Sequence, residues 1–575
     1  MSVKDVVAAV QTSGTPDKSP APARIPRPAP SARRRLLAAT AAVLAVALLF
    51  VAYLQVSRTY PENSDESNTL LMAWDLLHGN LLLHGWSMSD VSFYTTELPE
   101  YALLERLFGL HTDTAHIGVA ITYTLVLVLA VLLALGRADQ RAASGGTLPR
   151  ILLTGGIMFA PQLGVAVFIL LLSVGHIGTA VPLLLTWLVL DRLGGARSAR
   201  LRWAVPVIVG LMLTWALVAD PLVLVVGIIP LVAVCAVRVG RAMFTAQQKA
   251  GREHRWAQAS LAAQAWELSL AAAAILAEAL ASLVSRLLRA SGGFMLHPVG
   301  YQLAPAHTWP KHAYVTAKGL LALFGAKPEG PALSLIFALI HLAGVALVAW
   351  AMWRVARHFL SWPDMISQIL LVAMVVNVVL YVPSTLADAT DLNAREFAVV
   401  LPFGAVLAGR TLAGGLRVRA GERPGWPRWQ QRLAAGLLAV SAAGLGYAAA
   451  QPSVPAANQQ LAQFLAAHHL TRGIGGYWLS SVVTVGSDGA VTIRSVGPDK
   501  LEPNMWESKS SWYDPASQRA TFLVTDSAPG FFNHWEPKAA ALAALGQPAR
   551  TYHYGPYTIY VWDRNLLPQV GSARG

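Results

Sequence analysis

The chain has 575 residues, of which 55% are hydrophobic and only 13% are charged, and its formal net charge is +13. A soluble globular protein carries roughly 25% charged residues, so this composition excludes an ordinary soluble enzyme. Apolar stretches recur from Leu36 to about Ala450, and each approaches the ~20 residues that cross a ~30 Å hydrocarbon core. We therefore predict a polytopic α-helical membrane protein. Its single cysteine, Cys235, excludes an intrachain disulfide.

Eleven membrane-spanning helices are predicted. They follow residues 1–35, a basic tail rich in proline, alanine, serine and arginine that is expected to be disordered and cytoplasmic. Of the 44 lysines and arginines, 27 fall in this tail and in the loops on its side of the membrane, whereas the opposite loops between spans hold 8. This bias predicts a cytoplasmic N-terminus and an outer C-terminus, and it accounts for the positive charge without nucleic acid as a partner. The predicted spans are 36–56, 116–136, 151–173, 177–190, 204–219, 222–237, 261–284, 331–352, 365–384, 397–413 and 433–450.

Two outer loops between the spans are long enough to contain helices. In the first loop, 57–115, an apolar stripe predicts a helix over 65–77, and a proline in the first turn predicts another over 99–108. The second loop, 285–330, has a similar pattern over 310–324. Helices this short and amphipathic are expected to lie on the membrane surface.

The segment 451–575 is predicted to be a small extracytoplasmic α/β domain that follows a transmembrane domain of residues 36–450. Alternating valine, threonine, isoleucine and tyrosine predict strands, and helices are expected over 456–468 and 537–545. Gly473, Gly475 and Gly476 form only a fragment of a dinucleotide-binding fingerprint and precede a predicted strand, so no nucleotide cofactor is expected. The predicted strands are 476–485, 491–496, 520–525, 550–554 and 557–563.

The two outer loops carry opposite charge. The first holds nine acidic residues against two basic ones, and the second holds five basic residues, including Arg289 and Lys311, against one acidic residue. If both loops line one cavity, they suit a substrate with a phosphate at one end and a nucleophile that must be deprotonated at the other. The alternative is that acidic loops only serve solubility.

Asp65 and Glu66 stand a few residues beyond the first span, at the start of the predicted surface helix. A carboxylate there can cap the helix and meet its positive dipole end, which contributes roughly 0.5–2 kcal/mol. It can equally act as a general base, or as a ligand for a divalent metal, near the bilayer surface. Spacing alone leaves these interpretations equally open.

Further candidate residues lie elsewhere on the predicted outer face. Arg395 precedes a late span and can hold a lipid phosphate with its bidentate guanidinium group, or it can pair with Asp388, Asp391 or Glu396. Asp220, followed by proline, is expected to be a turn rather than a charge at mid-bilayer. The remaining candidates are outer-face aromatic, acidic and histidine side chains that would contact substrate or, for the aromatic ones, form an interfacial belt. They are Trp86, Tyr94, Glu97 and His176.

Two phrases of the sequence resemble a known family. Asp65-Glu66-Ser67 is followed by Trp74-Asp75 and by Gly79-Asn80, and Arg395-Glu396-Phe397 is followed by Leu401-Pro402. These residues are similar to the first outer loop and to a late span of the GT-C superfamily, the integral-membrane glycosyltransferases that use polyprenyl-phosphate sugars. Protein O-mannosyltransferases and the lipid A aminoarabinose transferase belong to that superfamily. Glu396 replaces the tyrosine of the family phrase, which leaves the role of Arg395 open.

The resemblance implies a glycosyltransferase on the outer face of a bacterial inner membrane. Asp65, or else Glu66, would deprotonate the acceptor, and Arg395, Lys311 and Arg289 would bind the lipid phosphate. The implied partners are a polyprenyl-phosphate sugar, membrane lipids, and a glycan, lipid or protein acceptor of the cell envelope. No cofactor is fixed, although a divalent metal remains an option. A transporter or lipid flippase, with Glu267 and Glu278 as its polar groups, and a non-enzymatic scaffold are the alternatives.

Overall fold

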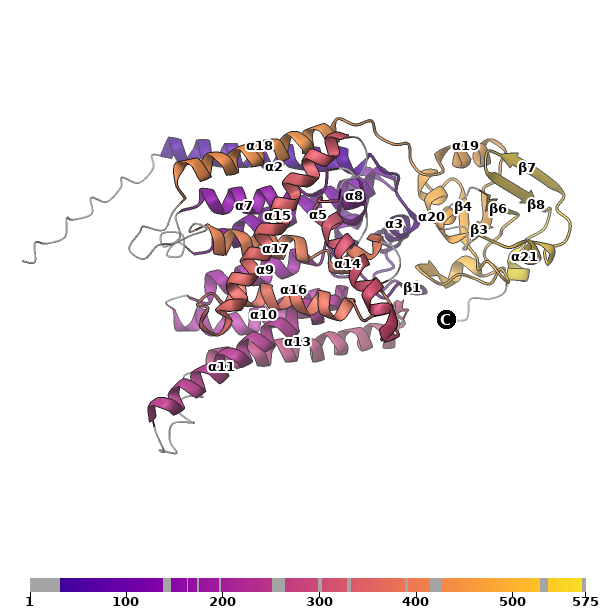
Figure 1. Cartoon of the computed structure of the whole chain (residues 1–575). Coiled ribbons are helices and arrows are strands. Elements are labelled where there is room, and N and C mark those ends of the chain that lie inside the picture. Colours follow the sequence, from indigo (N-terminus) through magenta and orange to yellow (C-terminus); the bar gives the residue numbers. More distant parts are fainter. Residues whose placement is uncertain are drawn as a thin grey trace, which may run out of the picture. The chain divides into compact units, whose positions relative to one another are not determined.

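The computed structural model describes residues 32–137, 146–162, 164–172, 175–195, 198–250, 264–297, 302–327, 332–387, 391–413, 426–527 and 536–570. The chain forms two compact units, Met1–Leu48 and Leu49–Gly575. In the first unit, the described residues form the beginning of helix α2 (Ala32–Ser57), and most of the predicted tail lies outside the described residues. Everything that follows concerns the second unit unless a segment of α2 is named (Figure 1).

Seven helices of the described chain are long and apolar enough to cross a membrane, which confirms a multi-pass α-helical membrane protein. Each corresponds to one of the predicted spans. They are α2, α5 (Asp113–Leu135), α10 (Ala199–Ala219), α11 (Ile229–Ala250) with the preceding turn η1 (Leu224–Ile228), α13 (Ala265–Ala290), α15 (Ala332–Arg357) and α18 (Arg428–Ala449).

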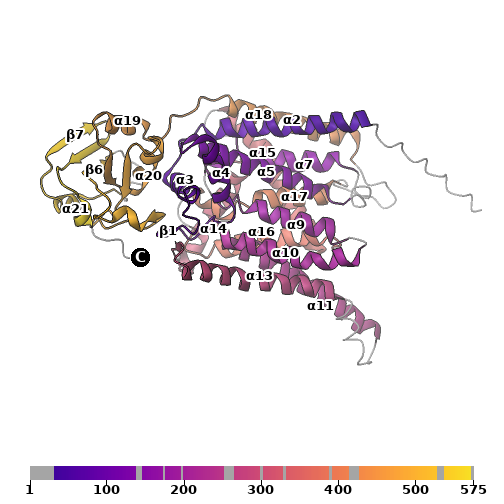
Figure 2. The ribbon, with the colours of Figure 1, turned by 180° about the vertical axis from the view of Figure 1, so that it is seen from behind.

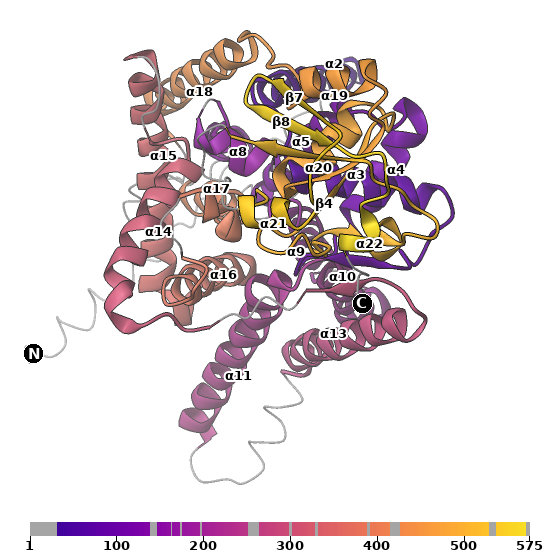
Figure 3. The ribbon, with the colours of Figure 1, turned by 90° about the vertical axis from the view of Figure 1, so that its right-hand side faces the viewer.

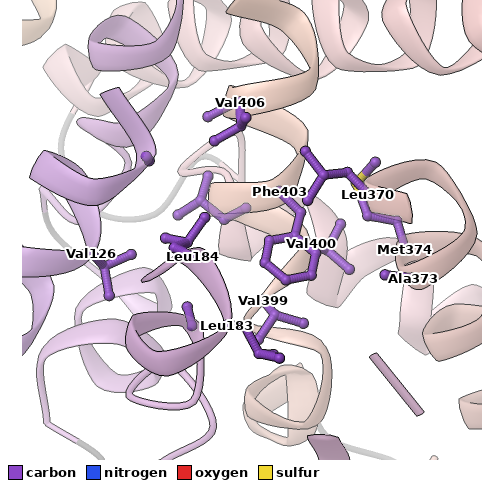
Figure 4. Close-up of a cluster of buried hydrophobic side chains, with 14 of the residues drawn as sticks. Val126, Leu183, Leu184, Leu370, Ala373, Met374, Val399, Val400, Phe403 and Val406 are labelled. Carbon is purple, nitrogen blue, oxygen red and sulfur yellow. The ribbon is translucent and has the colours of Figure 1, made fainter. Parts of the chain in front are cut away.

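The other four predicted spans correspond to shorter helices. The expected span 151–173 is wrong as one helix, because the chain breaks around Pro161 into α7 (Leu148–Met158) and α8 (Val165–Leu171). The remaining three are α9 (Ala180–Leu193), α16 (Met365–Tyr381) and α17 (Val400–Leu412). All thirteen residues of α17 are buried, and Figure 4 shows Val400, Phe403 and Val406 among side chains of α9 and α16. A helix enclosed by protein need not match the bilayer thickness, because lipid does not reach its ends.

The loop predicted to be the first outer one, residues 57–115, forms α3 (Ser64–Leu77) and α4 (Glu97–Phe108), close to the predicted bounds. The expectation that these helices lie on the membrane surface is wrong for α3. Nine of its residues are buried, including polar ones such as Asn68, and it packs against α4 and against α20 (Tyr477–Gly486) of the C-terminal segment. In the second outer loop, η2 (Ala306–Thr308) leads into α14 (Trp309–Leu323), as predicted.

A three-stranded sheet joins segments that are far apart in the sequence. Its central strand β1 (Trp86–Met88) pairs in parallel with β2 (Met295–Leu296) of the second outer loop. On its other side β1 pairs antiparallel with β5 (Ser508–Lys509) of the C-terminal segment. Both outer loops and the C-terminal segment are therefore tied together on the side of the helices that holds the C-terminal strands, as Figures 1 and 2 show.

The C-terminal segment contains a five-stranded sheet with the order β4-β3-β6-β8-β7, which Figure 3 shows from its own side of the molecule. Strands β4, β3 and β6 are parallel, and β8 and β7 complete the sheet antiparallel. This arrangement confirms a small α/β domain. Its elements are α19 (Gln459–Ala467), β3 (Arg472–Gly475), α20, β4 (Thr492–Ser495), β5, η5 (Ser510–Tyr513), β6 (Phe522–Asp526), α21 (Ala539–Ala543), β7 (Arg550–Tyr554), β8 (Tyr557–Val561) and α22 (Leu567–Val570).

One predicted strand of this segment is wrong. Residues 476–485 form the helix α20, because β3 and β4 are parallel neighbours and a parallel pair needs a crossover connection, which is usually helical. The strand β3 was not predicted, because its two glycines disfavour a strand. Gly473 is required by packing, since a Cβ atom there would lie 2.2 Å from the ring of Phe522.

Candidate active site

The two adjacent acids at the start of α3 have different tasks. Asn63 is the N-cap, and its side chain accepts hydrogen bonds from the backbone N–H groups of Asp65 and Glu66. Glu66 is buried, and its Oε2 accepts the backbone N–H of Asn63 at 2.9 Å, which completes a capping box. The carboxylate of Asp65 is thereby left free to point away from the helix end.

Arg395 lies opposite Asp65. It is carried by η4 (Asp391–Phe397), the turn that precedes α17, and its Nη1 is 3.4 Å from Oδ2 of Asp65. Its Nε is 3.8 Å from Oε1 of Glu396, and its side chain remains 38% exposed. Of the pairings considered from the sequence, the one with Glu396 is present, whereas Asp388 and the side chain of Asp391 lie outside the described residues.

A buried histidine, His176, contacts the carboxylates of Glu396 and Asp220. His176 Nε2 is 3.0 Å from Oε2 of Glu396, and its Nδ1 is 2.7 Å from Oδ2 of Asp220. Asp220 also accepts hydrogen bonds from the hydroxyl of Thr179 and from the backbone N–H of Leu222 at 2.8 Å, in the turn that the Asp-Pro sequence predicts. Burial opposes charge on His176, but the two carboxylates outweigh it and hold its pKa well above the usual value. This shift favours the imidazolium form of His176, in which both ring N–H groups can donate to the two acids.

The C-terminal domain supplies the other contacts of Asp65. The hydroxyl of Tyr477, the first residue of α20, donates to Oδ1 of Asp65 at 2.7 Å and lies 2.9 Å from Oε2 of Glu507. Asn68 donates its amide N–H to the same hydroxyl at 3.2 Å, and the hydroxyl of Ser64 donates to the backbone carbonyl of Tyr477 at 2.7 Å. Burial, followed by the charge of Asp65, raises the pKa of Glu507 to about 8.

One cavity of about 380 Å³ is lined by Asp65, His176, Arg395, Glu396, Tyr477 and Glu507. This volume is within the range of about 300–1,000 Å³ that small-molecule sites occupy. Two of its residues, Phe93 and Glu507, hold positive φ angles of 50° and 49°, which cost energy for residues other than glycine and which cluster at functional sites. The lining residues are Asp65, Ser89, Asp90, Val91, Phe93, Gly175, His176, Arg395, Glu396, Tyr477, Trp478, Trp506 and Glu507.

Several residues proposed from the sequence lie elsewhere. Trp86 donates its indole N–H to Asp75 at 2.8 Å and supports the small sheet, and Tyr94 donates its hydroxyl to the carbonyl of Leu81 at 2.7 Å. Glu97 is buried against Gly178, and burial raises its pKa to about 8. None of these three lines the cavity.

The basic second loop does not form the wall expected from the charge pattern. Arg289 and Lys311 are exposed and are not among the residues that line the cavity. The loop reaches the site region through the pairing of β2 with β1. Cations from other parts of the chain contact the acidic first loop instead: Arg395 contacts Asp65, and Lys509 contacts Asp75.

A protein-held divalent metal does not fit the donor set. Within the described ranges, no three histidine, cysteine, aspartate or glutamate side chains come together in a way that could hold a metal ion. Asp65 and Glu507 are both engaged by the Tyr477 hydroxyl, and Glu396 is engaged by His176. We therefore derive no catalytic step through a metal.

Four cavity-lining residues of the C-terminal domain were not predicted from the sequence. Tyr477 and Trp478 fall in the segment that was predicted as a strand, and Trp506 and Glu507 fall between predicted elements. A signal was present, because Trp506-Glu507 places an aromatic and an acidic residue side by side in a loop, and loops often carry function. Nothing in the local sequence shows that this loop meets α3.

No protein-family model matches the sequence, and no curated protein matches it. Two solved structures are similar to the chain. The crystal structure of ArnT from Cupriavidus metallidurans bound to undecaprenyl phosphate has a TM-score of 0.48 and 13% identity, over 92% of this chain and 98% of that one. The crystal structure of the Archaeoglobus fulgidus oligosaccharyltransferase tethered with an acceptor peptide has a TM-score of 0.43 and 15% identity, over 84% of this chain and 69% of that one. We rest no conclusion on likenesses of this size and base the function on the residues of the cavity.

Proposed function

We propose that the protein is a glycosyltransferase. It moves a sugar from a polyprenyl-phosphate donor to an acceptor on the extracytoplasmic face of a bacterial inner membrane. The observation that carries the proposal is that a carboxylate, Asp65, and a partly free guanidinium group, Arg395, lie 3.4 Å apart on the wall of one cavity in a membrane-spanning protein. Both stand in the two phrases of the sequence that resemble the GT-C superfamily.

Asp65 is the general base of this proposal. Its carboxylate removes the proton from the acceptor's nucleophilic group as that group attacks the anomeric carbon of the donor sugar. Direct displacement inverts the configuration at that carbon. The capping box fixes the helix end that carries Asp65, and the Tyr477 hydroxyl fixes the orientation of its carboxylate.

Arg395 stabilises the leaving group. As the bond between the anomeric carbon and the phosphate oxygen breaks, the electron pair stays on the polyprenyl phosphate, whose growing charge needs an electrostatic partner more than a proton. A guanidinium group offers paired donors to phosphate oxygens. The contacts of Arg395 at 3.4 and 3.8 Å are long, so it has donors left for a phosphate.

The walls of the cavity suit a sugar. Trp478 and Trp506 are half-buried, and Trp506 stacks on His297 with ring centroids 5.6 Å apart. Flat aromatic faces beside carboxylates are suitable for stacking on a sugar ring while its hydroxyls bind at the edges. The acceptor, which is a glycan, a lipid or a protein of the cell envelope, would approach along the C-terminal domain.

The test is transfer or slow hydrolysis of a panel of short-chain polyprenyl-phosphate sugars by protein in nanodiscs, followed by release of polyprenyl phosphate. Asp65→Asn keeps the shape but loses the base, and we expect the rate to fall about 10²–10⁴-fold. Glu66→Gln is the matched control, because glutamine also completes a capping box, and it should retain the wild-type rate. Equal rates for Asp65→Asn and wild type would refute the assignment of Asp65, and no release from any donor would count against the glycosyltransferase.

A further inference from the structure

A second polar cavity lies far from the candidate active site. It has a volume of about 640 Å³ and opens between the last part of α11, the first turn of α13 and the turn η3 (Phe359–Ser361) that precedes α16. Figure 1 shows this end of α11 on the side of the helices that points away from the C-terminal strands. Glu267, which could have served a transporter within the membrane, lies instead in the first turn of α13, at this cavity.

Two arginines, Arg238 and Arg241, contribute hydrogen-bond donors to the wall of the cavity. Arg238 uses Nη1 to donate to Oε1 of Gln368 at 2.8 Å, and Arg241 donates to the backbone carbonyl of Leu360. Among the described residues, the Nε–H of Arg238 and the indole N–H of Trp362 are shielded from solvent and have no hydrogen-bond partner. Both residues line the cavity together with Arg241, so its wall offers cationic and hydrogen-bonding side chains to an acceptor.

The depth of the cavity corresponds to a membrane surface. The apolar run begins at Leu224, and at 1.5 Å per residue Arg241 lies about 26 Å and Thr245 about 32 Å further along the helix. The hydrocarbon core is ~30 Å thick, so the two residues stand where the headgroup layer begins. Trp362 at the same cavity is a residue type enriched at that level.

We infer that this cavity binds the headgroup of an anionic phospholipid. The guanidinium groups of Arg238 and Arg241 take the phosphodiester oxygens, and Glu267 and Gln264 accept hydrogen bonds from headgroup hydroxyls. The lining side chains carry two positive charges and one negative charge, so the site favours a headgroup with net charge −1 over a zwitterionic one. The site is independent of the proposed sugar transfer.

A lipid is favoured over a soluble phosphate ester by position. Arg238, Arg241 and Trp362 line a cavity that borders membrane-crossing helices, and a phospholipid brings its phosphate to this depth with its acyl chains beside α11 and α13. A soluble ester would have to enter the headgroup layer without such an anchor.

The experiment uses the full-length protein, delipidated in detergent, with phosphatidylglycerol, phosphatidylcholine or soluble glycerol phosphate added, and bound ligand counted by native mass spectrometry. We expect retention of phosphatidylglycerol and about tenfold weaker binding in Arg241→Gln, since a charge-assisted hydrogen bond is lost. Ala242→Trp, which fills the cavity without changing its charge, should weaken binding similarly. Arg432→Gln on α18 is the matched control, because it removes an exposed arginine outside the cavity, and it should bind as wild type does.

Three results would overturn the inference. They are equal retention of phosphatidylcholine, unchanged binding in both Arg241→Gln and Ala242→Trp, and displacement of the lipid by glycerol phosphate at equal concentration. The last of these would assign the cavity to a soluble phosphate ester. Arg241 is exposed, so a thermal unfolding midpoint close to that of wild type shows that its substitution has not disrupted the fold.

Discussion

Two arginines, one in the turn before α17 and one within that helix, each contact two carboxylates, but the geometry of their contacts differs. Arg410, near the end of α17, donates to both oxygens of Asp364 at 2.8 Å and to Asp191 at 3.0 Å. Its Nη1 also donates to the backbone carbonyl of Leu133 at 2.6 Å, and its side chain is only 2% exposed. This guanidinium group joins α17 to α5, α9 and the start of α16, so its role is to hold helices together.

Arg395, in the turn before α17, presents the opposite case. Its contacts with Asp65 and Glu396 are 3.4 and 3.8 Å long, and 38% of its side chain is exposed to the cavity. Glu396 has a second partner in His176. A guanidinium group with spare donors, held beside acids that have other partners, is available for a ligand. The two arginines therefore differ in how completely their hydrogen-bond donors are used, although a count of ion pairs alone would equate them.

The largest effect on stability should come from removing Arg410 from its ion pairs with Asp191 and Asp364. Arg410→Met leaves the carboxylates of Asp191 and Asp364 without their cation, which should cost about 3–5 kcal/mol in the free energy of unfolding. Arg395→Met should cost less than about 1 kcal/mol, because its pairs are long and partly exposed. The free energy of unfolding of both variants is measured in the same detergent. Equal losses of this free energy would show that the two arginines stabilise the fold equally.

The next largest effect concerns the affinity for polyprenyl phosphate. Arg395→Gln should weaken the binding of polyprenyl phosphate about 10–100-fold, since charge-assisted hydrogen bonds contribute about 1.5–3 kcal/mol. Arg395→Lys should recover only part of the affinity, because an ammonium group keeps the charge but loses the bidentate geometry. Titration of each variant with polyprenyl phosphate measures this. Full affinity in Arg395→Gln would contradict an anion-binding role.

A smaller effect should follow from loosening Asp65. Tyr477→Phe removes the hydroxyl that holds the Asp65 carboxylate, and we expect kcat to fall about tenfold while the binding of polyprenyl phosphate stays unchanged. Tyr513→Phe is the matched control, because that hydroxyl is also buried in the C-terminal domain but donates to the carbonyl of Ser495 at 2.6 Å, outside the cavity. An equal fall in both variants would indicate a general loss of domain stability.

The sequence predicted the parts of this comparison that depend on local patterns. Apolar length located the spans, and acidic residues after the first span located the helix start at Asp65. The choice between Asp65 and Glu66 remained open, because both can cap a helix and only the geometry shows that Glu66 completes the capping box. Arg395 was chosen from its phrase, but its approach to Asp65 across 330 residues is a tertiary contact that no local pattern encodes.

The part of the site that lies in the C-terminal domain was not predicted. The alternation of residues 476–485 suggested a strand, but the parallel pairing of β3 and β4 made this segment a helix, whose first residue, Tyr477, points at Asp65. The charge pattern suggested that the basic second loop faces the acidic first loop. The second loop does pair with the first loop through β2 and β1, but its Arg289 and Lys311 do not line the cavity, and the pairing of β1 with β5 brings the C-terminal segment to the first loop as well.

The smallest effect at neutral pH is expected from a change at Glu507, whose pKa is raised. Burial and the nearby charge of Asp65 raise it to about 8 from the ordinary value of 4.5. The folded protein therefore keeps a proton that the unfolded chain loses. The stability contributed by this proton is fully present below about pH 4.5, falls as the pH rises and is lost once the pH passes about 8.

Glu507→Gln removes this titration and keeps a neutral donor for the Tyr477 hydroxyl. The Tyr477 hydroxyl lies 2.7 Å from Oδ1 of Asp65 and 2.9 Å from Oε2 of Glu507, so an amide at position 507 keeps a neutral hydrogen-bonding group beside it. The variant should match the wild-type rate at about pH 7 within about twofold, and it should lose less stability than wild type between about pH 6 and pH 9. Rates and unfolding midpoints across this range measure both effects. If Glu507→Gln were as slow as Tyr477→Phe at neutral pH, Glu507 would have to be charged in the working protein. Asp65 would then share its tyrosine with a second carboxylate, and the availability of Arg395 for a phosphate would be correspondingly reduced.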